Sequence, residues 1–258
     1  MNITAYIMGI SPPRRLAWLR KTIDYMDSQE FPFKKKVVSI DQIRGYTVPD
    51  DLLNHLKNNG WEVLVDTHSS RILSMDRAFS VIDTELIFYN EDDVMATLPR
   101  YEDIKEVFET KIGARNCGML SMTLGGTQYD AASGNLGDLA FMEDNTIMVN
   151  DEYRIFRRLE EFRSEWFFEF PGLFVKTKLF KDCHEKAKGS GNQVERALTT
   201  SYLTSNYESQ YYKASVAKTK ALSILLEDGR QVNSHCRLLT NLDPDQGNGV
   251  AVIGAHDY

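Results

Sequence analysis

The sequence predicts an α/β fold in which a mostly parallel central sheet is flanked by helices. Short β-rich runs alternate with stretches of helical periodicity through the first ninety residues, and turn-forming residues separate them. The composition, 42% hydrophobic and 26% charged, is that of a globular chain. Strands that alternate with helices of about ten to fifteen residues pair in parallel through right-handed crossovers. We therefore expect a Rossmann-like sheet.

The first strand and helix follow one another directly. Residues 3–10 are β-rich and stop at Ser11, which is expected to cap a helix that has Pro12 in its first position. The apolar residues that follow recur at helical spacing: Leu16, Leu19, Ile23 and Met26. A second strand over residues 36–41 then ends on Asp41.

The next two units repeat the alternation. Asp50 is expected to cap a second helix, which Gly60 ends in the position after the C-cap. A strand over residues 61–66, a helix over 69–82 and a strand over 85–90 follow. These four strands make up the parallel core of the predicted sheet.

Beyond residue 95 the pattern is looser. The elements expected there are a helix from residue 99, a strand over 117–123, a glycine-rich loop over 125–137, an aromatic strand over 166–175, a helix over 191–205 capped by Ser190, and a strand over 211–216. We expect one domain over residues 1–258, in two halves (1–95 and 96–240) followed by a turn-rich tail (241–258).

An acidic run follows the fourth predicted strand. Asn90, Glu91, Asp92 and Asp93 stand where that strand ends, and ligands of open α/β sheets bind at the carboxyl ends of the strands. Carboxylates at this edge can hold a hard divalent cation that keeps positions open for phosphate oxygens. The alternative is a solvated polar strand end without a ligand.

This order of elements, with strands ending in Asp41, Asp66 and Glu91-Asp92-Asp93, resembles the nucleotide-binding half of family 2-like GT-A glycosyltransferases. The resemblance covers residues 3–95 well and 115–215 loosely, and it implies that the half over 1–95 binds the nucleotide sugar and the half over 96–240 binds the acceptor. In that family the carboxylates of a DXD motif hold Mn²⁺ or Mg²⁺, which bridges the diphosphate of a nucleotide sugar. The resemblance implies a metal-dependent transferase that moves a sugar from a UDP- or GDP-linked donor to a glycan or other hydroxyl acceptor.

The motif carries over residue by residue. Glu91 takes its first position, which is usually Asp, while Asp92 takes the middle and Asp93 the last. The resemblance implies that Glu91 and Asp93 hold the metal, with His235 as a late third ligand, and that Asp93 takes part in catalysis. His235 has the alternative of a structural or exposed role.

The resemblance places further residues at the nucleotide: Gly9, Ser11, Asp41, Asp66, Arg71, Arg77, Glu91 and Asp92. Gly9 and Ser11 stand where the family wraps the nucleoside, and Asp41 where it reads the base. Asp41 and Asp66 have the alternative of capping a turn or a helix. Arg71 and Arg77 are both candidates for the diphosphate, since guanidinium groups form bidentate contacts with phosphate. Their alternative is a solvated pair with Asp76 or Asp83.

An inverting transfer needs a general base that deprotonates the acceptor hydroxyl. The resemblance assigns this role to an acid near the start of a late helix, which is Glu195 here. An acidic residue early in a helix is also favoured by the helix dipole, without any catalytic role.

Composition excludes several other classes. A net charge of −7, from 30 basic and 37 acidic residues, argues against a general nucleic-acid coat. No apolar run approaches the roughly 18 residues of a transmembrane span, and the first residues do not resemble a signal peptide. Three cysteines without a CxxC pair argue against a disulfide framework. We expect a cytoplasmic protein.

Two other functions stay open. One is a sugar-1-phosphate nucleotidyltransferase, but its glycine-rich first loop is missing, because the first turn here reads Gly9-Ile-Ser-Pro-Pro-Arg14. The other is a degenerate glycosyltransferase scaffold that only binds a sugar or a protein, which the Glu91 departure supports.

The loop over residues 125–137 generates the first testable prediction. Its glycines give access to positive φ, and loops of this length inside compact chains usually have a function. We expect a mobile lid or an acceptor-side loop that orders when donor and metal bind and excludes water. The alternative is a surface loop without a role. Limited proteolysis within 125–137 should slow markedly when a nucleotide sugar and Mn²⁺ are added. Equal cleavage in both conditions would contradict the lid.

Overall fold

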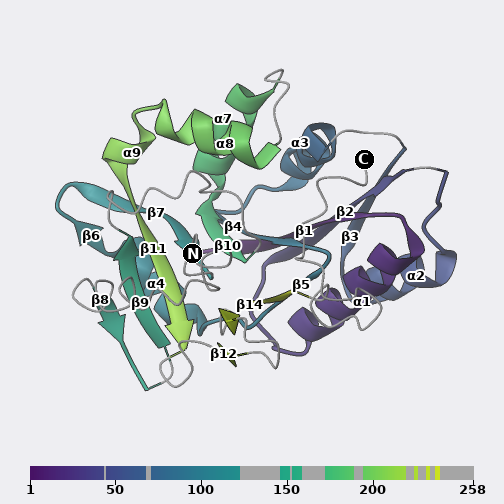
Figure 1. Cartoon of the computed structure of the whole chain (residues 1–258), viewed down its shortest axis with the longest axis horizontal. Helices are drawn as coiled ribbons and strands as arrows, with labels where there is room; N and C mark the ends of the chain where they lie inside the picture. Colours follow the sequence, from purple (N-terminus) through teal and green to yellow (C-terminus); the bar gives the residue numbers. More distant parts are fainter. Residues whose placement is uncertain are drawn as a thin grey trace.

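The computed structural model (Figure 1) describes residues 1–43, 45–67, 71–122, 146–151, 153–158, 172–188, 194–218, 224–225, 231–232 and 236–238. The predicted loop over 125–137 and His235 lie outside these residues, as does most of the aromatic strand predicted over 166–175.

One large sheet contains the predicted parallel core. The strands are β1 (Ile3–Ile10), β2 (Lys35–Gln42), β3 (Glu62–Thr67), β4 (Leu86–Glu91), β5 (Val94–Ala96), β6 (Lys111–Ile112), β7 (Arg115–Ser121), β8 (Thr146–Val149), β9 (Tyr153–Arg158), β10 (Leu173–Lys176), β11 (Tyr211–Lys218), β12 (Ile224–Leu225), β13 (Gln231–Val232) and β14 (Cys236–Leu238). The sheet runs β3-β2-β1-β4-β10-β7-β11-β9-β8, with β6 on β7. β12 pairs with β13, and β14 with β5.

Helices cover both faces of this sheet (Figure 1). They are α1 (Pro13–Asp27), α2 (Asp50–Asn58), α3 (Arg71–Val81), α4 (Tyr101–Glu109), α7 (Thr177–Ala187), α8 (Val194–Leu203) and α9 (Tyr207–Gln210). Because successive strand residues point to opposite faces, β1 places Ile3, Ala5 and Ile7 against the layer of α1, α2 and α4. Tyr6 and Met8 pack against the layer of α3, α7 and α8. The α/β class with helices on both faces is confirmed. No described helix has the length and apolar character needed to cross a membrane.

Two predicted helix caps are wrong. Pro12, not Ser11, is the N-cap of α1, because the Ser11 hydroxyl accepts a hydrogen bond from the Ile43 backbone N–H (3.0 Å) across the edge of the sheet. Pro49, not Asp50, precedes α2, and Asp50 lies in the first turn, where the helix dipole favours it. Gly60 ends α2 as expected, at φ +79°.

One strand departs from the parallel pattern. β10 inserts between β4 and β7 and is antiparallel to both. The parallel direction resumes with β7 and β11, which pair with each other. Gly172 donates its N–H to the Tyr89 carbonyl (2.9 Å) and accepts from the Met122 N–H (2.7 Å). β7 therefore ends at the same edge of the sheet as β4, and the chain leaves it there toward residue 123.

Gly118 has a packing role in β7. A Cβ at this position would lie 2.7 Å from Tyr211 Cβ, 2.9 Å from Tyr211 Cγ and 3.0 Å from Leu179 Cδ2. Two of these atoms belong to the rigid part of the tyrosine, so the strands would have to move apart. Glycine is therefore required by close approach at this position rather than by a turn.

Substitution of Gly118 tests this packing. Gly118→Ala should lower the free energy of unfolding by about 1–3 kcal/mol, the usual effect of overpacking a core, and Gly118→Val should lower it further. Urea denaturation followed by circular dichroism measures both, with the slope of the transition unchanged. An unfolding midpoint for Gly118→Ala equal to that of the parent chain would contradict the predicted clash.

Candidate active site

The acidic residues of the sequence meet at the carboxyl edge of the sheet. Asp41 is the next-to-last residue of β2 and stands in register with Asp66 of β3. In the neighbouring pairs, Ile10 of β1 is in register with Asp41, and Met8 with Glu91 of β4. The parallel core thus brings these carboxylates to one edge, as the strand order predicts.

The acidic run divides between the two faces of the sheet. Glu91 is the last residue of β4 and stands two residues after Tyr89, on the same face of the strand. Tyr89 packs against the α3 layer. The Tyr89 hydroxyl donates to Glu91 Oε1 (3.2 Å), and Arg71 Nη2 lies 3.6 Å from the same oxygen. The next two acids turn toward α1 instead. Glu91 therefore belongs to the α3 side of the edge, and Asp92 and Asp93 belong to the α1 side.

A single arginine holds the α1 side together. Arg15 donates from Nε to Asp92 Oδ2 (3.0 Å), from Nη2 to Asp92 Oδ1, and from Nη1 to Asp93 Oδ2 (2.8 Å). Asp92 is fully buried and also faces the Ile10 N–H (3.3 Å), while its backbone carbonyl accepts from the Thr22 hydroxyl (3.0 Å). The Asp92 carboxylate, expected at the nucleotide, is thus engaged inside the protein.

Burial raises the pKa of Asp92 to about 7, with the Arg15 guanidinium opposing this rise and the charges of Asp93 and Glu91 adding to it. A carboxyl with these neighbours is costly to ionise without its arginine. Arg15 is therefore what keeps a charged Asp92 compatible with the fold.

Gly9 makes room for this arrangement. A Cβ on Gly9 would lie 3.3 Å from Asp92 Cβ and 3.4 Å from Asp92 Oδ2. A Cβ at this position would therefore meet Asp92 in an unusually tight contact, and the Asp92 side chain would have to move by a few tenths of an ångström. In this structure Gly9 serves the acidic cluster, and Ser11 beside it fixes the following turn through Ile43, with its own N–H donated to the Asp41 carbonyl (3.0 Å).

Asp93 retains one oxygen for a ligand. Asp93 Oδ2 is taken by Arg15, but Oδ1 is buried and has no hydrogen-bond partner among the described residues. A buried carboxylate oxygen left in this state is unfavourable unless a donor or a cation meets it. The oxygen donors of Asp93 and Glu91 fit a hard divalent cation, which prefers carboxylates.

The two candidate arginines differ in their partners. Arg71 begins α3 and lies close to Glu91, whereas Arg77, one and a half turns further along the helix, contacts the buried carboxylate of Asp66. Neither described contact is the pair with Asp76 or Asp83 that the sequence left open. Both arginines therefore extend from α3 toward the acidic edge.

The side chains of two residues predicted at the site lie outside the described part of the chain. The Glu195 side chain lies outside the described part of the chain, although α8, in which it falls, begins at Val194. His235 is not described, but β14 directly after it pairs antiparallel with β5, the strand that follows the acidic run, with Leu238 opposite Val94. Their roles remain predictions.

Sequence reasoning missed Arg15. The signal was present: Arg15 is the third residue of α1, in a first turn without any acidic residue. The helix dipole disfavours a cation there, so an arginine in that position indicates an anionic partner beyond the helix. The partner lies 77 residues further along the chain, which no local pattern reveals.

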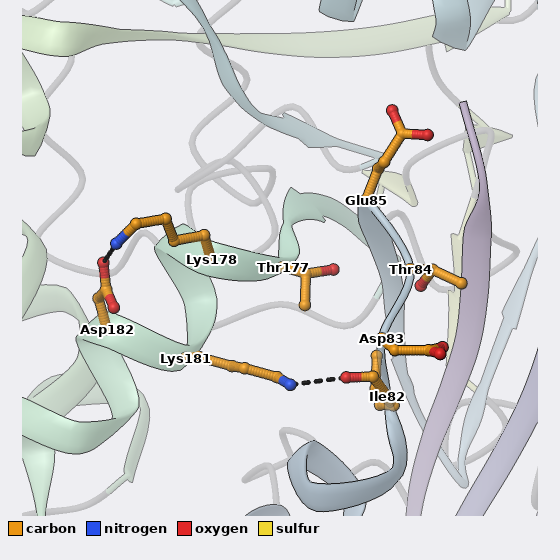
Figure 2. A pocket seen from close by; sticks show the side chains of 8 residues that line it. All are labelled: Ile82, Asp83, Thr84, Glu85, Thr177, Lys178, Lys181 and Asp182. Carbon is orange, nitrogen blue, oxygen red and sulfur yellow. Dashed lines mark hydrogen bonds and ion pairs between the residues drawn. The ribbon is translucent and has the colours of Figure 1, made fainter.

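A hollow lies at the other end of the strands, between the start of β4 and α7 (Figure 2). It has a volume of about 380 Å³, and both of its lysines are already engaged. Lys178 Nζ bonds Asp182 Oδ2 (2.6 Å), and Lys181 Nζ donates to the Ile82 carbonyl (2.6 Å). None of the residues predicted to bind the nucleotide lines this hollow.

The fold is similar to several solved structures at low sequence identity. Residues 1–349 of S. aureus TarS in complex with UDP-GlcNAc are 13% identical with a TM-score of 0.47, and the match covers 83% of this chain and 58% of that fragment. Mannosyltransferase PcManGT from Pyrobaculum calidifontis, in complex with GDP-Man and Mn²⁺, is 9% identical with a TM-score of 0.49, covering 82% and 53%. Glucosyl-3-phosphoglycerate synthase from Mycobacterium tuberculosis, in complex with Mn²⁺, UDP and phosphoglyceric acid, is 10% identical with a TM-score of 0.40, covering 70% and 57%.

The chain spans less than two thirds of the length of each of these three proteins. The structure itself shows a mixed α/β sheet with a parallel core flanked by helices, which is the α/β class that the sequence predicted. No family model and no curated protein matches the sequence.

Removal of Arg15 tests its role. Arg15→Ala should lower the free energy of unfolding at about pH 8 by up to about 3–5 kcal/mol, because Asp92 is largely ionised there in the parent chain and the variant leaves its buried carboxyl without a partner. At about pH 6, below the pKa of about 7, Asp92 is already largely protonated in the parent chain, so the charge contributes little and the loss is smaller. Denaturant unfolding at both pH values measures this.

The neighbouring arginine provides the control. Arg14 is exposed, and its guanidinium lies over the Trp18 ring, 5.0 Å from the centroid. Arg14→Ala should change stability by less than about 1 kcal/mol. Equal losses for the two variants, or a loss for Arg15→Ala that does not depend on pH, would contradict the assignment.

Proposed function

We propose that this chain is a metal-dependent glycosyltransferase that moves a sugar from a nucleotide-diphosphate donor, UDP- or GDP-linked, to a hydroxyl acceptor such as a glycan. The observation that carries the proposal is the buried, unpartnered Oδ1 of Asp93, among the described residues, beside Glu91 at the carboxyl edge of a GT-A-like sheet. Asp41 and Asp66 stand in register at the same edge, which supports the proposal that they bind the nucleoside.

The charge of this edge favours a divalent cation. Among the described residues, three arginines contact acids of this edge: Arg15, Arg71 and Arg77. The described carboxylates of the edge outnumber them, with five: Asp41, Asp66, Glu91, Asp92 and Asp93. A diphosphate approaching an excess of carboxylates is repelled unless a cation lies between them. Mn²⁺ or Mg²⁺ would be held by Glu91 and Asp93, with His235 as a further candidate, and supplies charge neutralisation at the leaving diphosphate.

The chain's own residues supply the remaining requirements. Arg71, 3.6 Å from Glu91, is placed to contact phosphate oxygens from the α3 side. Glu195 is the proposed base that takes the proton of the acceptor hydroxyl as that oxygen attacks the sugar. Asp41 is proposed to bind the base of the nucleotide. A cytoplasmic location, with its supply of nucleotide sugars, is part of the same proposal.

A second candidate function is sugar-nucleotide binding without transfer. Its support is Arg15, whose guanidinium occupies both oxygens of Asp92 and one of Asp93. When an arginine of the protein neutralises the acidic edge, less of that charge has to be neutralised by a metal ion. Such a protein can keep its fold after losing catalysis. The two functions differ in turnover rather than in binding.

Calorimetric titration with UDP- and GDP-sugars, with and without Mn²⁺, tests the proposal. At least one donor should bind, and Mn²⁺ should tighten its binding. Asp93→Asn should abolish the metal effect and lower sugar transfer or donor hydrolysis by at least about a hundredfold, since it removes the charge that fixes the cation.

Asp83→Asn is the matched control, because Asp83 is an exposed acid just before β4, at the other end of the strand. It should leave binding and turnover unchanged. Binding without any turnover across the donors, equal for the parent chain and Asp93→Asn, would favour the second candidate. No binding of any nucleotide would overturn both.

A further inference from the structure

A cluster of metal-ligating side chains lies away from the acidic edge, between two helices of one layer. Asp76 comes from the middle of α3, and His184 and Glu185 come from the last turns of α7. The two helices pack on the same face of the sheet (Figure 1). One ligand atom from each of the three residues lies within 4.8 Å of the other two.

The histidine is oriented as a metal ligand is. His184 is fully buried, and its Nε2 lies 3.0 Å from the backbone carbonyl of Ile72. A carbonyl only accepts, so Nε2 carries the hydrogen and Nδ1 presents a lone pair. The Phe79 ring stands edge-on to the imidazole at 5.0 Å and 87°, which holds its plane. Metal-binding histidines typically donate their other N–H to such a carbonyl.

The lone pair on Nδ1 faces a second acceptor. Nδ1 has no hydrogen-bond partner in the described part of the chain, and it lies 3.5 Å from Asp76 Oδ1. This is longer than the about 2.7–2.9 Å of a charge-assisted N–H···O bond. It is close to the about 3.3 Å that separates two ligands of one tetrahedral Zn²⁺ with bonds of about 2.0–2.1 Å.

The structure already brings a cation to the two carboxylates. Lys188 Nζ lies 2.6 Å from Asp76 Oδ1 and 2.5 Å from Glu185 Oε1. Lys188 is the C-cap residue just after α7, and its side chain is about one third exposed, so it can turn into solvent. The described contacts of the ammonium are to the two carboxylates, and His184 Nδ1 is left without a hydrogen-bond partner among the described residues.

We propose that Asp76, His184 and Glu185 form a binding site for a divalent transition-metal ion such as Zn²⁺, which displaces the Lys188 ammonium. Imidazole in the donor set selects zinc-type ions, whereas the all-oxygen acidic edge suits Mg²⁺ or Mn²⁺. The site is independent of the proposed transferase function. Bound metal would tie α7 to α3 one turn from Arg71, the first residue of α3.

The test uses the full chain carrying Asp93→Asn, so that the acidic edge does not contribute. One equivalent of Zn²⁺ should bind in a competition titration against a chelating dye, and excess Mg²⁺ should not displace it. Co²⁺ should give the visible absorption of a tetrahedral nitrogen–oxygen site. Asp76→Asn and Glu185→Gln, both on partly exposed residues, should each weaken Zn²⁺ binding by at least about tenfold.

Lys188→Met distinguishes a metal site from an ion-pair network. It removes the competing ammonium and should tighten Zn²⁺ binding by about fivefold. Asp182→Asn, an acid of α7 outside the cluster, is the control and should leave the affinity unchanged. The proposal is overturned if Lys188→Met weakens Zn²⁺ binding or leaves it unchanged, if Asp76→Asn has no effect, or if Asp93→Asn alone abolishes binding.

Discussion

The bond between Arg15 and Asp92 is the interaction on which this edge of the molecule depends. Asp92 has no exposed surface, yet three elements converge on it: α1 through Arg15 and Thr22, β1 through the Ile10 N–H, and β4, from which it extends. A pair of this kind contributes little net stability compared with an apolar core, but removing one partner leaves an uncompensated charge. The position of α1 against the sheet is therefore coupled to the ionisation of one carboxylate.

The same guanidinium sets the geometry of the acidic edge. By holding Asp93 through Oδ2 alone, Arg15 leaves Oδ1 directed elsewhere. Glu91 is positioned from the other layer, by the Tyr89 hydroxyl and Arg71. The edge is therefore built jointly by helices from both faces.

The parallel core was predictable because its signals are local. Periodicity and turn residues identify β1–β4 and their helices, and the strand order brings the acids together. The partner of Arg15, the antiparallel insertion of β10 and the true bond of Ser11 were not predictable, because each depends on residues far away in the sequence. The helix α7 was not predicted from the sequence. That Arg71 lies near Glu91 and Arg77 contacts Asp66 could be seen only from the position of α3 in the structure.

The insertion of β10 has a consequence for the order in which the chain can fold. β4 and β7 are separated in the sheet by a strand that is synthesised more than fifty residues after β7 ends. Until Leu173–Lys176 leaves the ribosome, β4 is an edge strand with an unpaired row of backbone groups, and β7 lacks its neighbour on that side. The nascent N-terminal half therefore has an unpaired strand edge that is open to intermolecular strand pairing until β10 is added.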